Sequence, residues 1–357
     1  MAASAIVCVC VCVCSVCALG ATHNCLCFRP QSAELVTARG DIVVTNASGT
    51  WVTDGSGHTT WSNDTTLFFA LRGGGGSTWG VVTSLTIRTH DNQPGGFMSI
   101  STVWAGLLAT QFDTLEEVTD TYLAWSQSLG PKWSGLAWFT PTFNKTLGAA
   151  TWEVMLQYVY LGGEADPEYQ ATWVPFAAKF SAFNYLQSAR NYTKWWDYVN
   201  MAPLEPIYPV DGMQPSATSV GGVPSVLVQR DIVNTTYKAQ LLASMKECVT
   251  ASSVCTQNQI YQDITGNVGA TQAAGTAISD NFRTALYHVV FTPAPPSVAD
   301  AYYQLGSNSY FSESAYEMSG WQDRYWGDHA DTLLSIKQRW DPSGVFGCRH
   351  CVGDTSS

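Results

Sequence analysis

The stretch LRGGGGSTWGVV, residues 71–82, decides the fold, because four consecutive glycines separate an expected helix from an expected strand. Glycines allow positive φ and let peptide amides approach a flat or anionic ligand where any Cβ would collide. A flexible linker is the alternative. The flanking residues favour a fixed turn: Asp64 can cap a helix over Thr65–Leu71, and Gly73 stands where a left-handed C-terminal residue belongs. Residues 81–88 then alternate as a strand with one apolar face, so we expect a turn that approaches a cofactor.

The glycine run is not a nucleotide fingerprint of the two commonest kinds. No expected strand leads directly into it, no expected helix follows it, and the lysine of a phosphate-binding loop is missing. The ligand class must therefore come from other parts of the chain.

The C-terminal part supplies three further motifs. They are SYFSES at 309–314, YWGDHA at 325–330 and DPSGVF at 341–346. Together with the glycine run they resemble the FAD-linked oxidases of the berberine bridge enzyme-like family, in the vanillyl alcohol oxidase superfamily with its PCMH-type FAD-binding domain. Ser312 stands where that family usually has Asn, and His329 and Ala330 replace its Asn and Tyr. The tail CRHCVG, 348–353, is similar to that of fungal members.

The resemblance covers most of residues 31–353 and implies an α+β fold. The C-terminal part of a PCMH-type FAD-binding domain, residues 29–90 plus the returning segment 306–357, would enclose a substrate domain. That domain, residues 91–305, would be an antiparallel sheet backed by helices. The family's upstream Gly-Gly-His motif and its flavin-linking Cys are missing, so we expect an N-terminally truncated chain. Cys25 and Cys27 lack the surrounding pattern, and no covalent linkage is transferred to them.

The resemblance also assigns site residues. Tyr310 is the expected proton acceptor, because a phenol beside a flavin can have its pKa lowered; a buried Tyr bonded to backbone is the alternative. His329 could instead be a surface residue at the start of its helix, and His58 is expected to be solvated. No metal ligands are expected. The expected flavin neighbours are Gly74, Gly75, Gly76, Ser77, Gly80, Val82, Trp326, Gly327 and His329.

The implied function is an FAD-dependent oxidoreductase. It would oxidise an alcohol-, sugar- or phenol-type small molecule by hydride transfer to the flavin, with molecular oxygen as the acceptor. The alternative is a catalytically inactive secreted protein that binds a carbohydrate or phenolic ligand. A hydrolase is disfavoured, because the chain has neither a Gly-x-Ser-x-Gly elbow nor a His-Glu-x-x-His motif.

Composition narrows the class of partner. In 357 residues, 46% are hydrophobic and 13% charged, which suits a large core, and the net charge is −11. Since no basic cluster interrupts the chain, we expect no nucleic-acid partner. We also expect a monomer with no membrane association.

Two segments are expected to be unusual. Residues 1–28 contain a Val-Cys repeat of the kind that a GTGTGT nucleotide repeat encodes, so they are either artefactual or a secretory signal. They are too short and cysteine-rich for a membrane span. Residues 49–61 are read as an inserted loop or another non-coding piece.

Cysteines and sequons favour a secreted glycoprotein. Apart from the N-terminal segment, four cysteines are left: Cys248, Cys255, Cys348 and Cys351. They suit two disulfides, or less well a four-thiolate zinc site. Five Asn-x-Ser/Thr sequons occur, at Asn46, Asn63, Asn144, Asn191 and Asn234.

Local patterns predict further elements. A hairpin is expected around Arg39-Gly40, and a helix over 114–129 with a Thr114/Glu117 capping box. The domain boundary is placed at 91–96. Strands are expected at 136–139, 151–160 and 284–291, and helices at 169–180, 237–249 and 328–339.

Overall fold

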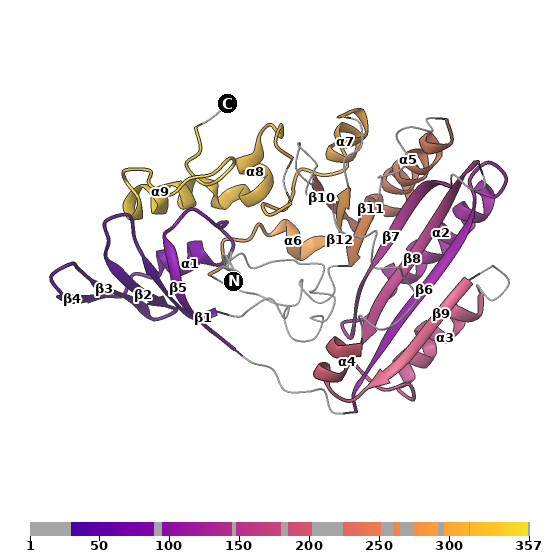
Figure 1. Ribbon diagram of the computed structural model, residues 1–357, viewed down its shortest axis with the longest axis horizontal. Coiled ribbons are helices and arrows are strands. Elements are labelled where there is room, and N and C mark those ends of the chain that lie inside the picture. The colour runs from indigo at the N-terminus through magenta and orange to yellow at the C-terminus, as the bar shows by residue number, and fades with distance from the viewer. Residues whose placement is uncertain are drawn as a thin grey trace.

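The computed structural model describes residues 30–88, 95–144, 148–179, 185–201, 224–250, 260–264, 275–291, 296–313 and 315–355. Two antiparallel sheets lie at opposite ends of its long axis, and the C-terminal helices lie against the smaller one (Figure 1). This arrangement is the α+β fold that the sequence predicts.

The smaller sheet has five strands in the order β4-β3-β2-β1-β5. The expected hairpin is present as the antiparallel pair β1 and β2. The expectation of a loop at residues 49–61 is wrong, because β3 and β4 form a second hairpin that continues this sheet, with Trp51 opposite Trp61. The Thr and Trp residues of these two strands suit such a solvated sheet edge. The strands are β1 Pro30–Val36, β2 Ile42–Asn46, β3 Gly49–Thr53, β4 Thr59–Ser62 and β5 Val81–Ile87.

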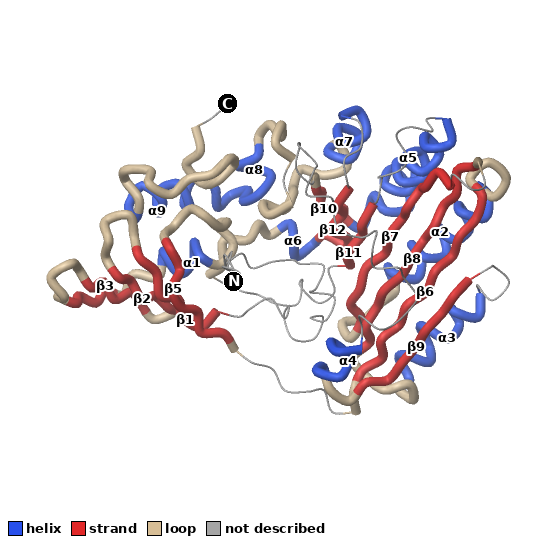
Figure 2. Tube along the Cα trace, viewed as in Figure 1, coloured by secondary structure: helices blue, strands red, loops and turns tan. Residues whose placement is uncertain are grey.

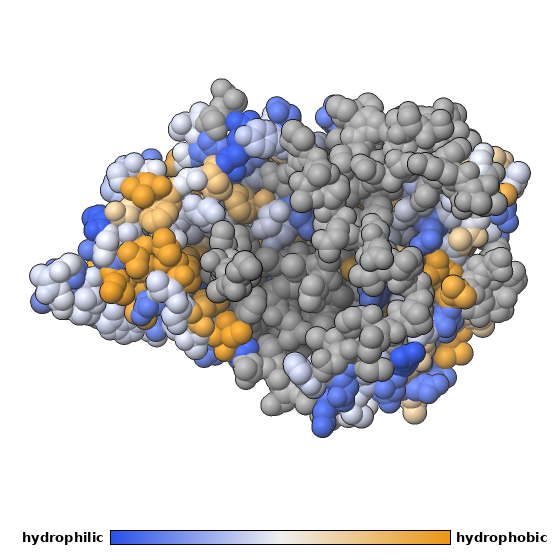
Figure 3. Space-filling view, in the orientation of Figure 1, coloured by the Kyte–Doolittle hydropathy of each residue, from blue (hydrophilic) through white to orange (hydrophobic). Residues whose placement is uncertain are grey.

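One face of β5 differs from the expectation. Val81 and Ile87 are open to solvent, 57% and 38% exposed, whereas Val82 and Leu85 pack partly against the core of the small sheet. The strand lies at the edge of the sheet, and its pairing with β1 is interrupted by register shifts. Figure 3 shows apolar surface over the end of the molecule that carries the small sheet.

The larger sheet has seven strands in the order β10-β12-β11-β7-β8-β6-β9, all paired antiparallel. Helices α2, α3 and α5 lie along it (Figure 2) and share a core with it. The strands are β6 Phe97–Leu107, β7 Trp133–Asn144, β8 Ala149–Tyr160, β9 Tyr185–Tyr192, β10 Ser225–Gln229, β11 Ile260–Ile264 and β12 Ala285–Phe291.

Helix α2, Phe112–Gln127, begins two residues before the expected start. The predicted capping box of Thr114 and Glu117 is therefore wrong, because both residues lie inside the helix and Gln111 precedes it without a side-chain cap. The expected apolar face is confirmed, since Leu115, Val118, Tyr122 and Trp125 are buried. The other helices are α1 Thr66–Leu71, α3 Pro167–Lys179, α4 Trp195–Met201, α5 Lys238–Thr250, α6 Asn281–Thr284, α7 Pro296–Tyr303, α8 Trp321–Trp326 and α9 Ala330–Trp340.

Several predictions concern residues outside this description. They are the segment 1–28, most of the boundary at 91–96, Cys255, and the side chains of Cys248 and Asn144. Within the described ranges, no helix combines the length and the apolar composition that crossing a bilayer requires.

Candidate functional site

The glycine run forms a bend between α1 and β5, and the carbonyl groups of Gly73, Gly75 and Gly76 face polar groups of the protein. Trp326 Nε1 donates to the Gly73 carbonyl over 3.1 Å, and Trp79 Nε1 donates to that of Gly75 over 3.0 Å. The Gly76 carbonyl accepts the Thr78 hydroxyl at 2.8 Å, and Cys351 Sγ lies 3.5 Å from it. The bend is thus held from the side of the C-terminal segment.

Three amides of the same bend, unlike these carbonyls, lack partners within the described part of the chain. Among the described residues, the backbone N–H groups of Gly75, Gly76 and Ser77 meet no acceptor. Gly75 and Gly76 are buried, and Ser77 stands at the exposed rim. Positive φ at Gly75 (87°) and Ser77 (59°) is the kind of backbone alternation that gathers amides into an anion- or carbonyl-binding concavity.

The glycines are also required by the protein's own packing. A Cβ on Gly74 would lie 2.6 Å from the Ala70 carbonyl oxygen, and one on Gly75 would lie 2.9 Å from the Phe311 ring. The expected reason for the glycines was ligand approach alone. The structure adds a second reason, because α1 and the C-terminal segment press on the inner side of the bend.

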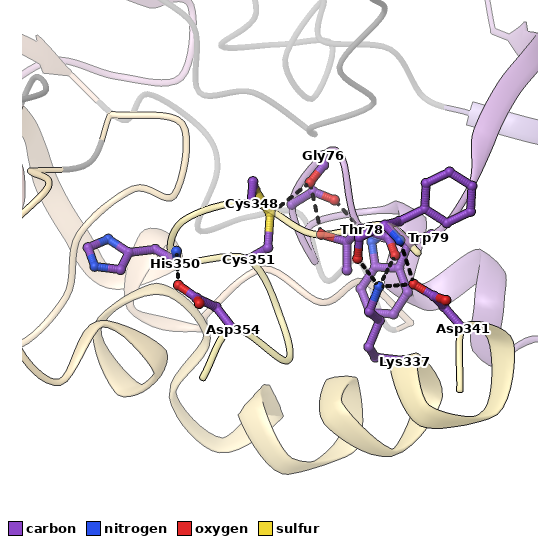
Figure 4. Close-up of a disulfide and its surroundings, with 11 residues drawn as sticks. Gly76, Thr78, Trp79, Lys337, Asp341, Cys348, His350, Cys351 and Asp354 are labelled. Atoms are coloured by element: carbon purple, nitrogen blue, oxygen red, sulfur yellow. Dashed lines mark hydrogen bonds and ion pairs between the residues drawn. A yellow bond between two sulfur atoms is a disulfide. The ribbon is translucent and has the colours of Figure 1, made fainter. Parts of the chain in front are cut away.

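A buried ammonium fixes the bend to α9 (Figure 4). Lys337 Nζ donates to the Thr78 carbonyl over 2.7 Å, to the Phe346 carbonyl, and to Asp341 Oδ2 over 2.5 Å. Asp341 in turn accepts the amides of Val345 and Phe346, both at 2.8 Å. Burial alone would raise the pKa of Asp341, but the hydrogen bonds from Lys337, Phe346 and Val345 outweigh it and lower the pKa.

The three predicted flavin neighbours of the C-terminal segment, Trp326, Gly327 and His329, differ in how closely they approach the bend. Trp326 is 1% exposed and stacks on Phe311 with 5.8 Å between ring centroids. Gly327 has a positive φ of 51°, and a Cβ there would lie 3.7 Å from Ser279 Oγ. His329 is half-buried at the start of α9, with its ring edge-on to Phe69 at 5.4 Å.

Two of the predicted flavin neighbours lie on the way into β5. Gly80 has a positive φ of 153°, and a Cβ there would lie 2.6 Å from the Val36 carbonyl oxygen. Val82 is half-buried opposite Leu35 of β1. The structure therefore gives Gly80 a clear packing role within the small sheet.

Tyr310 lies apart from the glycine bend, although the next residue, Phe311, lies against the bend. Phe311 packs in the core of the small sheet, whereas Tyr310 packs with Leu227 and Phe282 beside the large sheet. The chain thus crosses between the two modules at these two residues. Tyr310 is 7% exposed, and its amide donates to Ser225 Oγ over 2.9 Å.

The structure also identifies neighbours of Tyr310 that the sequence did not single out. His288 of β12 lies edge-on to the Tyr310 ring with 5.6 Å between centroids, and Glu313 Oε2 lies 3.0 Å from His288 Nε2. A lone His within an apolar strand carries no motif, so only the tertiary structure could bring it into the site.

The cysteines of the tail are bonded to one another, Cys348 to Cys351. This bond leaves no thiolate at either position for the zinc site considered above. Between them, His350 stacks on Trp321 at 5.1 Å, and burial, followed by the charge of Arg349, lowers its pKa. The disulfide holds the tail where Cys351 meets the glycine bend.

Comparison with known proteins shows what this chain is similar to. Residues 309–353 match the family "Berberine and berberine like". The chain is 23% identical over 301 residues to the FAD-linked oxidoreductase sor8 of Hypocrea jecorina, covering 80% of this chain and 49% of that protein. It is 25% identical over 352 residues to the FAD-linked oxidoreductase ZEB1 of Gibberella zeae, covering 90% and 54%. The chain spans about half the length of these curated relatives.

Solved structures show the same fold. The VAO-type flavoprotein MtVAO615 from Myceliophthora thermophila has a TM-score of 0.65 at 16% identity, covering 94% of this chain and 58% of that one. Berberine bridge enzyme from Eschscholzia californica has a TM-score of 0.62 at 14% identity, covering 91% and 66%. The predicted resemblance and fold class are confirmed.

Proposed function

We propose that this chain is part of an FAD-dependent oxidoreductase. It has the fold of VAO-type flavoproteins and a C-terminal segment that matches the berberine-like family. The observation that carries the proposal is the glycine bend: its carbonyls at Gly73, Gly75 and Gly76 accept hydrogen bonds from the protein, while three successive amides meet no acceptor among the described residues. A bend built in this way suits a ligand with acceptor atoms on a flat or anionic group.

The hydrogen-bond donors of the bend suit the acceptor atoms of a flavin. FAD, when bound, would supply the chemistry of accepting a hydride from the substrate. The amides of Gly75, Gly76 and Ser77 would donate to its acceptor atoms. Lys337 and Trp326 hold the bend in place by donating to the carbonyls of Thr78 and Gly73, on either side of these amides. Their arrangement is fixed by buried hydrogen bonds, so binding would require little reorganisation.

Tyr310 is the proposed proton acceptor. It is buried beside the large sheet, and its backbone is fixed by Ser225, which limits the positions that its ring can take. In its ionised form, a Tyr310 side chain held in this way could accept the proton of a substrate hydroxyl on its phenolate oxygen as the substrate is oxidised.

The proposed substrate is an alcohol, sugar or phenol, with molecular oxygen as electron acceptor. The support is the range of fold neighbours, which includes a chitooligosaccharide oxidase with a TM-score of 0.63 at 15% identity and berberine bridge enzyme itself. Oxygen uptake and peroxide release during turnover of sugar oligomers and aromatic alcohols would test this class.

Ser77 allows a direct test of cofactor binding by the bend. Because Ser77 is exposed at the rim and Asp tolerates its positive φ, Ser77→Asp should fold normally. Its carboxylate would repel acceptor atoms at the amides and compete for them, so FAD affinity should fall by about tenfold or more. Flavin fluorescence titration of the purified chain measures the effect.

Ser77→Asn is the matched control, because it is close in size and neutral. It should bind FAD like the wild type. Equal affinities of Ser77→Asp and Ser77→Asn would remove the bend from the flavin site. A folded wild-type chain that binds no FAD but does bind a sugar or phenol would favour the inactive binding protein instead.

We further propose that the protein is secreted, glycosylated and monomeric. Asn63 is exposed just before α1, in the sequon Asn63-Asp64-Thr65. When the chain is expressed through a eukaryotic secretory pathway, Thr65→Ala should remove one glycan, and Thr65→Ser, which preserves the sequon, should not. Mobility before and after amidase deglycosylation reports the result, and an unglycosylated wild type would contradict the proposal.

A further inference from the structure

A buried histidine lies opposite an acidic residue of the C-terminal segment. His288 of β12 has no exposed surface, and its Nε2 lies 3.0 Å from Glu313 Oε2, whose side chain is 23% exposed. An acidic oxygen at this distance from an imidazole nitrogen favours the protonated ring, because the opposite charge offsets part of the cost of burial.

Tyr310 lies against the same histidine. The two rings are perpendicular, at 89°, with centroids 5.6 Å apart. Phe282 of α6 encloses them on another side, edge-on to Tyr310 at 5.8 Å. An imidazolium in this apolar enclosure would act on the phenol with little screening by water.

The backbone explains why the three side chains meet. The Asn308 carbonyl accepts the Leu227 amide of β10 at 2.9 Å, so the C-terminal segment runs along β10. Ser225, which accepts the Tyr310 amide, also donates to the Glu313 carbonyl over 2.9 Å. Tyr310 and Glu313 are therefore held in one turn, beside the strand that pairs with β12.

We propose that His288 and Glu313 form an ion pair that positions Tyr310 and favours its ionised form. The proposal rests on the function proposed above, in which Tyr310 accepts the substrate proton. His288 keeps its own proton throughout, and the transferred proton moves from the substrate hydroxyl to the phenolate oxygen of Tyr310. The pair acts through Tyr310, so both members are positioning residues.

The positive charge of His288 should act on Tyr310 more strongly than the negative charge of Glu313, which favours the phenolate. The Glu313 carboxylate is partly in contact with water, whereas the imidazolium is fully enclosed, so water weakens the negative charge more than the positive one. Within the described part of the chain, the neighbours of His288 include Glu313 and Tyr310 from the C-terminal segment, Phe282 from α6 and Leu227 at the paired position on β10. Asp263 occupies the paired position on β11.

The first test measures the pair without requiring turnover. In the full chain labelled with isotopic histidine, the imidazole signals can be followed by NMR across pH, and His288→Asn assigns the signal of His288. We expect Glu313→Gln to make His288 about tenfold easier to deprotonate, because the stabilising charge is removed. Glu317→Gln, an exposed acid on the same segment, should leave the titration unchanged.

The second test concerns Tyr310. Replacing Tyr310 by Phe keeps the ring and should barely move the His288 signal, whereas Tyr310→Leu should shift it, because the ring current is lost. In preparations that turn over, Glu313→Gln should displace the pH profile of kcat to higher pH with little change in KM, and Glu317→Gln should not.

The outcomes separate this proposal from the function on which it rests. If the His288 titration is the same in wild type and Glu313→Gln, there is no ion pair, and the proposal is wrong even if the protein is an oxidase. If the NMR shift occurs but the kcat profile is unmoved, the pair is structural only, and the positioning role is rejected. Because Glu313 is partly exposed, Glu313→Gln should fold normally, so the test does not depend on whether the variant at the buried His288 folds.

Discussion

Replacing Lys337 by Met is expected to lower the free energy of unfolding by about 3–5 kcal/mol. The ammonium is 8% exposed and binds the Asp341 carboxylate together with the carbonyls of Thr78 and Phe346. Met fills a similar volume but donates nothing, so a fully buried carboxylate and two carbonyls lose their donor. Chemical denaturation followed by circular dichroism measures the change.

Arg339→Met is the matched control on the same helix. Arg339 is 60% exposed and pairs with Asp64 at 2.9 Å, so its loss should cost less than about 1 kcal/mol. Similar losses for the two variants would show that the buried cation is not what fixes α9 to the bend.

The Lys337 effect should also depend on pH in a defined direction. The pKa of Asp341 is lowered in the folded protein from its ordinary value of 3.8, although its burial opposes the shift, because of the hydrogen bonds from Lys337, Phe346 and Val345. The stability that this ionised carboxylate contributes is therefore present above pH 3.8 and lost as pH falls through the lower folded value. The difference between wild type and Lys337→Met should shrink in that acidic range.

The second large effect is expected at the glycine bend. Gly74→Ala should destabilise the fold by about 1–3 kcal/mol, because the new Cβ would lie 2.6 Å from the Ala70 carbonyl and 2.9 Å from Leu333. The clash is with backbone on one side and with α9 on the other, so neither neighbour yields easily. Thermal unfolding and FAD affinity should both be affected, since the bend must shift to fit the methyl group.

Gly55→Ala provides the comparison. Gly55 lies in the turn between β3 and β4, has no atom within 4 Å of its added Cβ and does not need a positive φ. Alanine there should be neutral or slightly stabilising. A Gly74→Ala protein as stable as Gly55→Ala would mean that the bend is looser than its contacts indicate.

The sequence predicted the local features well where a pattern is repeated along one element. The apolar face of α2 follows from spacing, because side chains recur every 3.6 residues along a helix, and β7, β8 and β12 cover most of the ranges expected to be strands. The helix start was misplaced because Thr114 and Glu117 have capping spacing wherever they occur, whereas α2 begins at Phe112. The hairpin at 49–61 could not be predicted in this way, because β4 is exposed along its whole length and has no alternation of buried and exposed positions.

By itself the sequence determined the glycine bend and the resemblance to a family, because glycines set the local backbone and the aromatic motifs can be compared directly. The tertiary structure decided which groups meet. Lys337, Trp326 and Cys351 reach the bend from more than two hundred residues away, and β12 brings His288 to Tyr310 and Glu313. Such contacts depend on how the sheets and the returning segment pack, and no spacing along the chain encodes them.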